Sequence, residues 1–139
     1  MRLNTKLSCS FLFICSSLMM SVIITNQSST AQSRSSFVVN LLSGKCIDVA
    51  GAPGRTNGAQ LLLWDCELSG RNADNGTATD QKWIITRDGF IRNQLSGKCI
   101  DVAGAPGRTN GAQLQLWDCE LSGRNADNGT ATDQRWRRE

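Results

Sequence analysis

The chain has 139 residues, which is enough for one ordinary domain but not for two. It contains no histidine and no tyrosine, which excludes His-based acid–base catalysis, Ser–His or Cys–His nucleophiles and His-ligated zinc. After residue 31 the chain carries 13 Lys and Arg against 12 Asp and Glu, and this nearly neutral balance argues against a nucleic-acid or membrane partner. All 13 glycines also lie after residue 31, a density that favours turn-rich β structure.

The N-terminus has the three parts of a secretory signal peptide. Arg2 and Lys6 form a basic start, residues 7–24 carry no charge and are largely apolar, and the Ser-Thr-Ala of 29–31 offers small residues to a signal peptidase. The alternative is a membrane anchor, although the serines within the apolar stretch favour cleavage. We therefore expect residues 1–31 to be removed and the protein to be secreted, or periplasmic in a Gram-negative cell.

The rest of the chain alternates short strand patterns with turn signals, after a short polar linker at 32–36. Asn57-Gly58 and Asp88-Gly89 are typical of tight turns. The polar stretch 67–80 predicts a long loop, and no stretch keeps a helical period. The sequence therefore predicts an all-β fold, with strands at 37–42, 46–49, 59–66, 83–87 and 90–93.

The sequence repeats itself after 53 residues. Residues 42–83 and 95–136 align without a gap and differ at two of the 42 positions. A period near 50 residues is typical of a repeat architecture. The two differences are Leu62 against Gln115 and Lys82 against Arg135.

The cysteines predict two disulfides. An even number of cysteines in a small exported domain favours disulfide bonds, and a zinc site would need closer ligand pairs than spacings of 20, 33 and 20 residues. Two of the six cysteines, Cys9 and Cys15, lie in the predicted signal peptide. The four that remain allow three connectivities, and identical units should close identical bridges. We therefore predict bonds inside each unit and no metal site, with the pairs Cys46–Cys66 and Cys99–Cys119.

Each unit carries three motifs in the same order: Cys-Ile-Asp-Val, Leu-Trp-Asp-Cys and Gln-x-Trp. This ordered set resembles the ricin B-chain type of β-trefoil lectin, whose repeats carry the Q-x-W motif. The resemblance covers about residues 37–139. It implies a carbohydrate-binding β-trefoil made of four-stranded units, here at about 37–89 and 90–139.

A trefoil of this family has three units, and the sequence supplies two. The chain stops three residues after Trp136, so we expect an incomplete trefoil that lacks the third unit. Open strand edges and an uncovered apolar face would remain. We expect chains to associate into a homo-oligomer that completes the trefoil, and the alternative is a truncated, non-functional duplicate.

The resemblance also implies one shallow sugar pocket in each unit. The aspartate of Cys-Ile-Asp-Val accepts hydrogen bonds from two sugar hydroxyls, a role that suits an acceptor-only carboxylate. The tryptophan of Leu-Trp-Asp-Cys stacks on the apolar face of the sugar, and the glutamine of Gln-x-Trp orients the aspartate. These residues are Asp48, Trp64 and Gln81 in the first unit and Asp101, Trp117 and Gln134 in the second.

Three features depart from the family pattern. The residue two before the stacking aromatic is commonly polar, and Gln115 fits this whereas Leu62 does not, so the first pocket is expected to lack one contact. The asparagine that commonly precedes the Gln-x-Trp glutamine is replaced by Asp80 and Asp133, which we place in the pockets. The loop at 67–80 is about twice the usual length, and it can wall or cover its pocket.

We therefore expect a non-catalytic module without a cofactor, which binds glycans of the galactose or xylose type. An enzyme would use a carboxylate pair such as Asp48 and Asp80 on a glycoside, but so short a chain leaves little room for a deep cleft. A structural or inhibitory protein-binding trefoil is a second alternative, from fold analogy alone. A third is calcium binding in the polar loop, although the bidentate glutamate of an EF-hand is absent. Its ligands would be Asn72, Asp74, Gly76 and Asp80.

Overall fold

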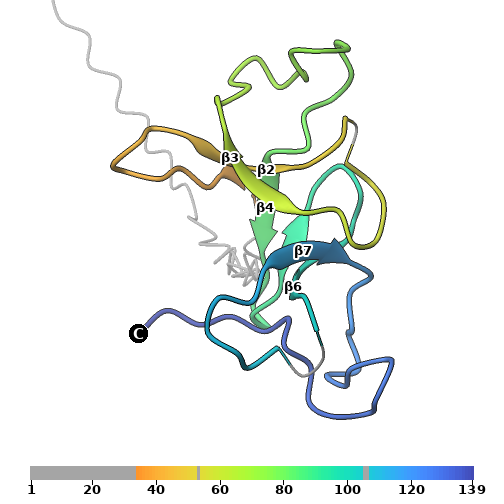
Figure 1. Cartoon of the computed structure of the whole chain (residues 1–139). Helices are drawn as coiled ribbons and strands as arrows, with labels where there is room; N and C mark the ends of the chain where they lie inside the picture. The colour runs from red at the N-terminus through yellow and green to blue at the C-terminus, as the bar shows by residue number, and fades with distance from the viewer. Residues whose placement is uncertain (1–33, 53, 105–106) are drawn as a thin grey trace, which may run out of the picture. The chain divides into compact units, whose positions relative to one another are not determined.

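The computed structural model describes residues 34–52, 54–104 and 107–139, so the predicted signal peptide lies outside the described residues. The described part holds short strands and no helix, which confirms the all-β prediction (Figure 1). It follows that no helix there has the length and apolarity to cross a membrane. The strands are β1 (Ser36–Phe37), β2 (Cys46–Val49), β3 (Leu61–Trp64), β4 (Lys82–Ile85), β5 (Ile91–Asn93), β6 (Cys99–Val102) and β7 (Leu114–Trp117).

Each repeat unit contains one β-hairpin, and the two hairpins have the same register. β2 and β3 pair antiparallel, with Cys46 opposite Trp64 and Val49 opposite Leu61. β6 and β7 pair in the same way, 53 residues further along the chain. Since facing residues share one side of a hairpin, the repeated sequence places equivalent side chains on equivalent faces.

A third hairpin, between β4 and β5, joins the two units. The strands pair antiparallel around the Asp88-Gly89 turn, as the sequence predicted. Gly89 has a φ of +87°, and a Cβ at this position would lie 2.9 Å from the carbonyl oxygen of Trp136. A glycine is therefore required both by the turn and by the close approach of the end of the second unit.

The strand predicted at 37–42 is shorter in the structure. β1 ends at Phe37, and an isolated bridge joins Val39 to Cys46. The side chain of Asn40 accepts hydrogen bonds from the backbone N–H groups of Leu42 and Ser43, at 3.1 and 2.9 Å. This local capture of the backbone turns the chain before the strand can continue.

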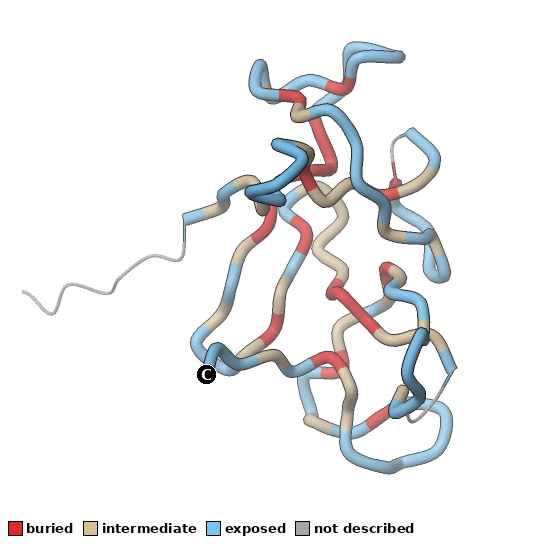
Figure 2. Tube along the Cα trace, turned by 60° about the vertical axis from the view of Figure 1, so that its left-hand side comes forward, coloured by how far each residue is buried: buried red, intermediate tan, exposed pale blue. Residues whose placement is uncertain are grey.

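The core lies between the two units and is small. Val49, Trp83, Ile100 and Leu116 are buried together, and Trp136 packs against them. Figure 2 shows in red that the buried positions are short stretches of the trace. The indole N–H of Trp83 donates to the carbonyl of Ile47 at 3.1 Å, so this fully buried ring keeps its polar atom satisfied. The tryptophans of both Gln-x-Trp motifs therefore serve packing.

The two predicted disulfides are present. Cys46 is bonded to Cys66, and Cys99 to Cys119. Each bond ties the first residue of a hairpin to the chain just beyond its second strand. The bonded cysteines are 20 residues apart in both units. The two disulfides therefore restrict the unfolded chain to a similar extent.

Candidate functional site

One cavity opens on each hairpin, at equivalent positions. The first has a volume of about 220 Å³ and the second of about 280 Å³. Each residue of the second cavity stands 53 residues after its equivalent in the first, and six of these shared positions carry a polar or aromatic side chain in at least one cavity. They are Asp48, Leu62, Trp64, Glu67, Asn72 and Asp74 in the first, and Asp101, Gln115, Trp117, Glu120, Asn125 and Asp127 in the second.

The hairpin register brings an aspartate and a tryptophan to the same face. Asp48 on β2 is opposite Leu62 on β3, and Cys46 is opposite Trp64 two residues away, so Asp48 and Trp64 share one side. The Trp64 side chain is 53% exposed, which leaves an indole surface open beside a carboxylate. Such a pair offers an apolar platform and a hydrogen-bond acceptor to one ligand.

Gln81 holds the first aspartate in place. It is fully buried, and its amide nitrogen donates to Oδ1 of Asp48 at 3.1 Å and to the carbonyl of Asp65 at 3.0 Å. Its amide oxygen accepts from the backbone N–H of Glu67 at 2.8 Å. Since the amide group bonds only to protein and does not line the cavity, this glutamine positions Asp48 instead of contacting a ligand.

Gln134 makes the same three contacts in the second unit. It donates to Oδ1 of Asp101 and to the carbonyl of Asp118, both at 3.1 Å, and accepts from the N–H of Glu120 at 2.9 Å. The second aspartate has a further partner, because the side-chain amide of Gln115 donates to its Oδ2 at 2.7 Å. Both carboxylate oxygens of Asp101 therefore accept a hydrogen bond from a side-chain amide. In the first unit Leu62 stands in the place of Gln115 and cannot donate one to Asp48.

Asp80 lies behind Asp48 and does not line the cavity. It is 2% exposed, accepts a hydrogen bond from the N–H of Gly54 at 2.9 Å, and has no partner for its other oxygen among the described residues. Burial is the main cause that raises the pKa of Asp48 to about 6, and the negative charges of Asp80 and Glu67 raise it further. The hydrogen bond from Gln81 opposes this rise in pKa.

The second unit repeats this pairing of carboxyl groups. Asp133 sits beside Asp101, and neither of its oxygens has a hydrogen-bond partner among the described residues. Burial, followed by the charges of Asp101 and Glu120, raises the pKa of Asp133 to about 6. Like Asp80, Asp133 does not line its cavity, whereas Asp101 beside it does.

The long loop forms one wall of the first cavity. Glu67 is buried at the start of the loop, and its Oε1 accepts from the backbone N–H of Ala73 at 2.9 Å, which ties the loop across itself. Asn72 and Asp74 complete this wall. Sequence reasoning placed the loop near the pocket but missed Glu67, whose only signal was its position directly after the cysteine of Leu-Trp-Asp-Cys.

The calcium alternative gains no support from the loop. The side chain of Asn72 already accepts the backbone N–H groups of Asp74 and Asn75, at 3.0 and 3.3 Å. In the described ranges, no group of three acidic, histidine or cysteine side chains is placed to hold a metal ion. Turn formation therefore accounts for the polar residues at this place in the loop.

A comparison with models of protein families finds a match. The model of the ricin-type β-trefoil lectin domain matches residues 34–139, about three quarters of the chain. No individual curated protein matches the sequence. The match spans both hairpins, both disulfides and both cavities. The chain therefore belongs to the ricin-type β-trefoil lectin family.

Proposed function

We propose that the protein is a non-catalytic lectin that binds neutral sugars in two cavities, one beside Asp48 and Trp64 and one beside Asp101 and Trp117. The observation that carries this proposal is the pairing of a positioned carboxylate with an indole on one hairpin face, found twice. Trp64 is exposed and Trp117 is half-buried. A carboxylate accepts bonds from adjacent sugar hydroxyls, and an indole packs against the C–H face of a pyranose.

The charge of the cavity walls narrows the ligand class. Asp48, Glu67 and Asp74 line the first cavity, and their equivalents line the second. Within the described ranges, no lysine or arginine lines either cavity. An anionic sugar would meet like charges without a cation to offset them, so neutral glycans of the galactose or xylose type are the proposed ligands.

Titration calorimetry tests this proposal directly. We expect galactose, xylose or their oligomers to bind, and galacturonic acid to bind more weakly than galactose. Replacing Trp64 and Trp117 together with alanine should abolish binding. Leu41→Ala is the matched control, because Leu41 is exposed and lines neither cavity. Binding by the double tryptophan variant at the parent's affinity would overturn the proposal, as would a neutral-glycan array without a signal.

Shallow single sites bind weakly, typically with dissociation constants near 1 mM, or about 4 kcal/mol. Two equivalent cavities on one chain raise the avidity for a branched or repeated glycan. We therefore propose that the natural ligand displays several copies of the recognised sugar. A comparison of monosaccharide with a polymer-linked form of the same sugar measures this gain.

We also propose that the protein is exported and that residues 1–31 are removed. The two disulfides support export, because such bonds persist in oxidising compartments and are rare in the cytosol. N-terminal sequencing of protein from an expressing culture should begin at Gln32. Mature protein that retains residues 1–31 in the membrane fraction would contradict this part of the proposal.

A further inference from the structure

Inside the chain, the first unit covers part of the second. The turn at 57–60 between β2 and β3 rests against β7, where the N–H of Gly58 donates to the carbonyl of Leu116 at 2.8 Å. The N–H of Leu116 in turn donates to the carbonyl of Ala59 at 2.8 Å. Leu116 is completely buried as a result. The turn thus adds a short strand contact to the outer side of β7.

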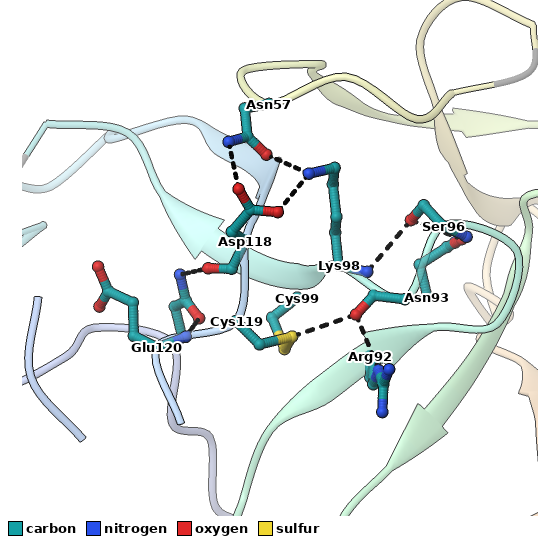
Figure 3. A network of polar contacts seen from close by, with 11 residues as sticks. Asn57, Arg92, Asn93, Ser96, Lys98, Cys99, Asp118, Cys119 and Glu120 are labelled. Atoms are coloured by element: carbon teal, nitrogen blue, oxygen red, sulfur yellow. Dashed lines mark hydrogen bonds and ion pairs between the residues drawn. A yellow bond between two sulfur atoms is a disulfide. The ribbon is translucent and has the colours of Figure 1, made fainter. Parts of the chain in front are cut away.

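Polar side chains close the edge of this contact (Figure 3). The amide of Asn57 donates to Oδ2 of Asp118 at 2.9 Å, and the ammonium group of Lys98 donates to Oδ1 of Asn57 at 2.7 Å. Lys98 also forms an ion pair with Asp118. Bonds from Lys98 and Asn57 lower the pKa of Asp118, so its carboxylate stays ionised in the contact.

The equivalent face of the first unit is uncovered. Leu63 on β3 corresponds to Leu116, but it is 48% exposed. Among the described residues none donates to or accepts from it on the outer side of β3. An apolar cavity of about 330 Å³ opens beside it, lined by residues of the first unit such as Ile47 and Leu61 and, from the second unit, by Gln113 and Leu114. The ion pair of Lys45 with Asp65, at 2.8 Å, is already in place at the edge.

The same chain also presents the matching turn. Residues 110–113 have the sequence Asn-Gly-Ala-Gln, identical to that of 57–60. The side chain of Gln113 accepts a hydrogen bond from Gln60 of the first unit at 2.7 Å. Asn110 and Gly111 are exposed, and among the described residues they form no hydrogen bond with the other unit. The chain therefore carries both halves of a contact that it already makes once within itself.

We propose that the Leu63 face binds the 110–113 turn of a second copy of this chain. By equivalence with the internal contact, Gly111 donates to the carbonyl of Leu63, and Leu63 donates to the carbonyl of Ala112. Asn110 lies between Lys45 and Asp65 of the other copy. The near-identity of the residues on both sides supports this occupant. Leu62 replaces Gln115, which forms a bridge with Gln60 in the internal contact. The hydrogen-bonded groups named above all have counterparts inside the chain.

The stoichiometry follows from closure. A trefoil closes after three units, and the described residues of one chain hold two. Three copies of these residues therefore provide the six units of two trefoils. The middle chain gives one unit to each trefoil and opens at the turn between β4 and β5. Each trefoil then makes three turn-on-strand contacts, compared with one in a separate chain.

Light scattering of the whole protein at micromolar concentration tests the assembly. We expect the mass of three chains, and a melting temperature that rises with protein concentration. Leu63→Asp and, independently, Ala112→Arg should each reduce the mass to that of one chain. Leu68→Asp is the control, because Leu68 is also an exposed leucine and does not line the cavity beside Leu63. A parent protein with the mass of one chain and a concentration-independent melt would overturn the proposal.

Cross-linking locates the contact. In a variant with Asn110→Cys and Asp65→Cys, a short bifunctional thiol reagent should link separate chains. The matched variant with Asn57→Cys and Asp118→Cys should link residues within one chain and leave its mass unchanged, because those side chains already touch. The parent protein, treated with the same reagent, is the control for reaction at the native cysteines. Failure of the first variant to link chains, when the second is linked internally, would refute the contact.

Discussion

The amide of Gln115 donates a hydrogen bond to Oδ2 of Asp101 at 2.7 Å. At the equivalent position the first cavity has Leu62, which cannot form this bond. With Gln134 on Oδ1, the second aspartate is fixed from two sides. Asp48 is fixed by Gln81 alone, because Leu62 stands in the place of the second amide. Two copies of one sequence thus present aspartates with different freedom.

We predict that the second cavity binds sugar more tightly than the first. A preorganised acceptor loses less entropy on binding, and one hydrogen bond contributes about 0.5–1.5 kcal/mol, or roughly two- to tenfold in affinity. Calorimetry on Trp64→Ala isolates the second cavity, and Trp117→Ala isolates the first. Leu62→Gln in the latter background should raise the affinity of the first cavity to that of the second. Equal affinities in the two single variants would refute this ranking.

The first cavity should lose affinity in mild acid. The pKa of Asp48 is raised to about 6, so its carboxylate is ionised at neutral pH and becomes protonated as the pH falls through 6. Protonation removes part of its capacity to accept bonds from sugar hydroxyls. In the Trp117→Ala background, affinity at pH 5 should be several-fold below that at pH 7.5. A flat profile between these values would show that Asp48 does not contact the sugar.

The two kinds of tryptophan should separate binding from stability. Trp83 is fully buried in the core, and its replacement by alanine should cost about 3–5 kcal/mol of unfolding free energy. Trp64→Ala, at an exposed ring, should change that free energy by less than about 0.5 kcal/mol while it removes binding at the first cavity. Denaturant unfolding and calorimetry on the same samples measure both effects. A large loss of stability in Trp64→Ala would assign that ring to the core.

Much of this organisation could be predicted from the sequence, because it depends on local or repeated patterns. The nearly identical repeat predicted the disulfide pairing, and Asp88-Gly89 indicated the joining hairpin. The difference between Leu63 and Leu116 could not be predicted, since the two residues stand in nearly identical sequences. Their burial depends on which neighbouring unit covers them.

At the site, too, the sequence motifs indicated some residues, and the packing of the chain decided the position of others. The motifs pointed to the aspartates and the tryptophans, but sequence reasoning placed Asp80 and Asp133 within the pockets. The structure puts both behind the aspartates that line the cavities. A residue next to a motif glutamine can face either side of the chain, and only the packing of Gly54 against Asp80 decides which.

Replacing Asp133 with asparagine should stabilise the protein at neutral pH. The pKa of Asp133 is raised from 3.8 to about 6, so the folded state holds its proton more tightly than the unfolded state. The stability linked to that proton is fully present below about pH 4 and is lost as the pH rises through 6. Neither oxygen of Asp133 has a hydrogen-bond partner among the described residues, so the amide sacrifices no bond.

Thermal unfolding measured from pH 4 to pH 8 tests this sign. The Asp133→Asn variant should melt several degrees above the parent at pH 7.5, and the gap should close toward pH 4, where the parent carboxyl is protonated. Asp127→Asn, an exposed carboxyl of the same loop, should leave the profile of the parent unchanged. The amide also relieves the repulsion on Asp101, so sugar affinity at the second cavity should rise at neutral pH. Parallel melting profiles with unchanged affinity would mean that Asp133 does not interact with the Asp101 carboxylate.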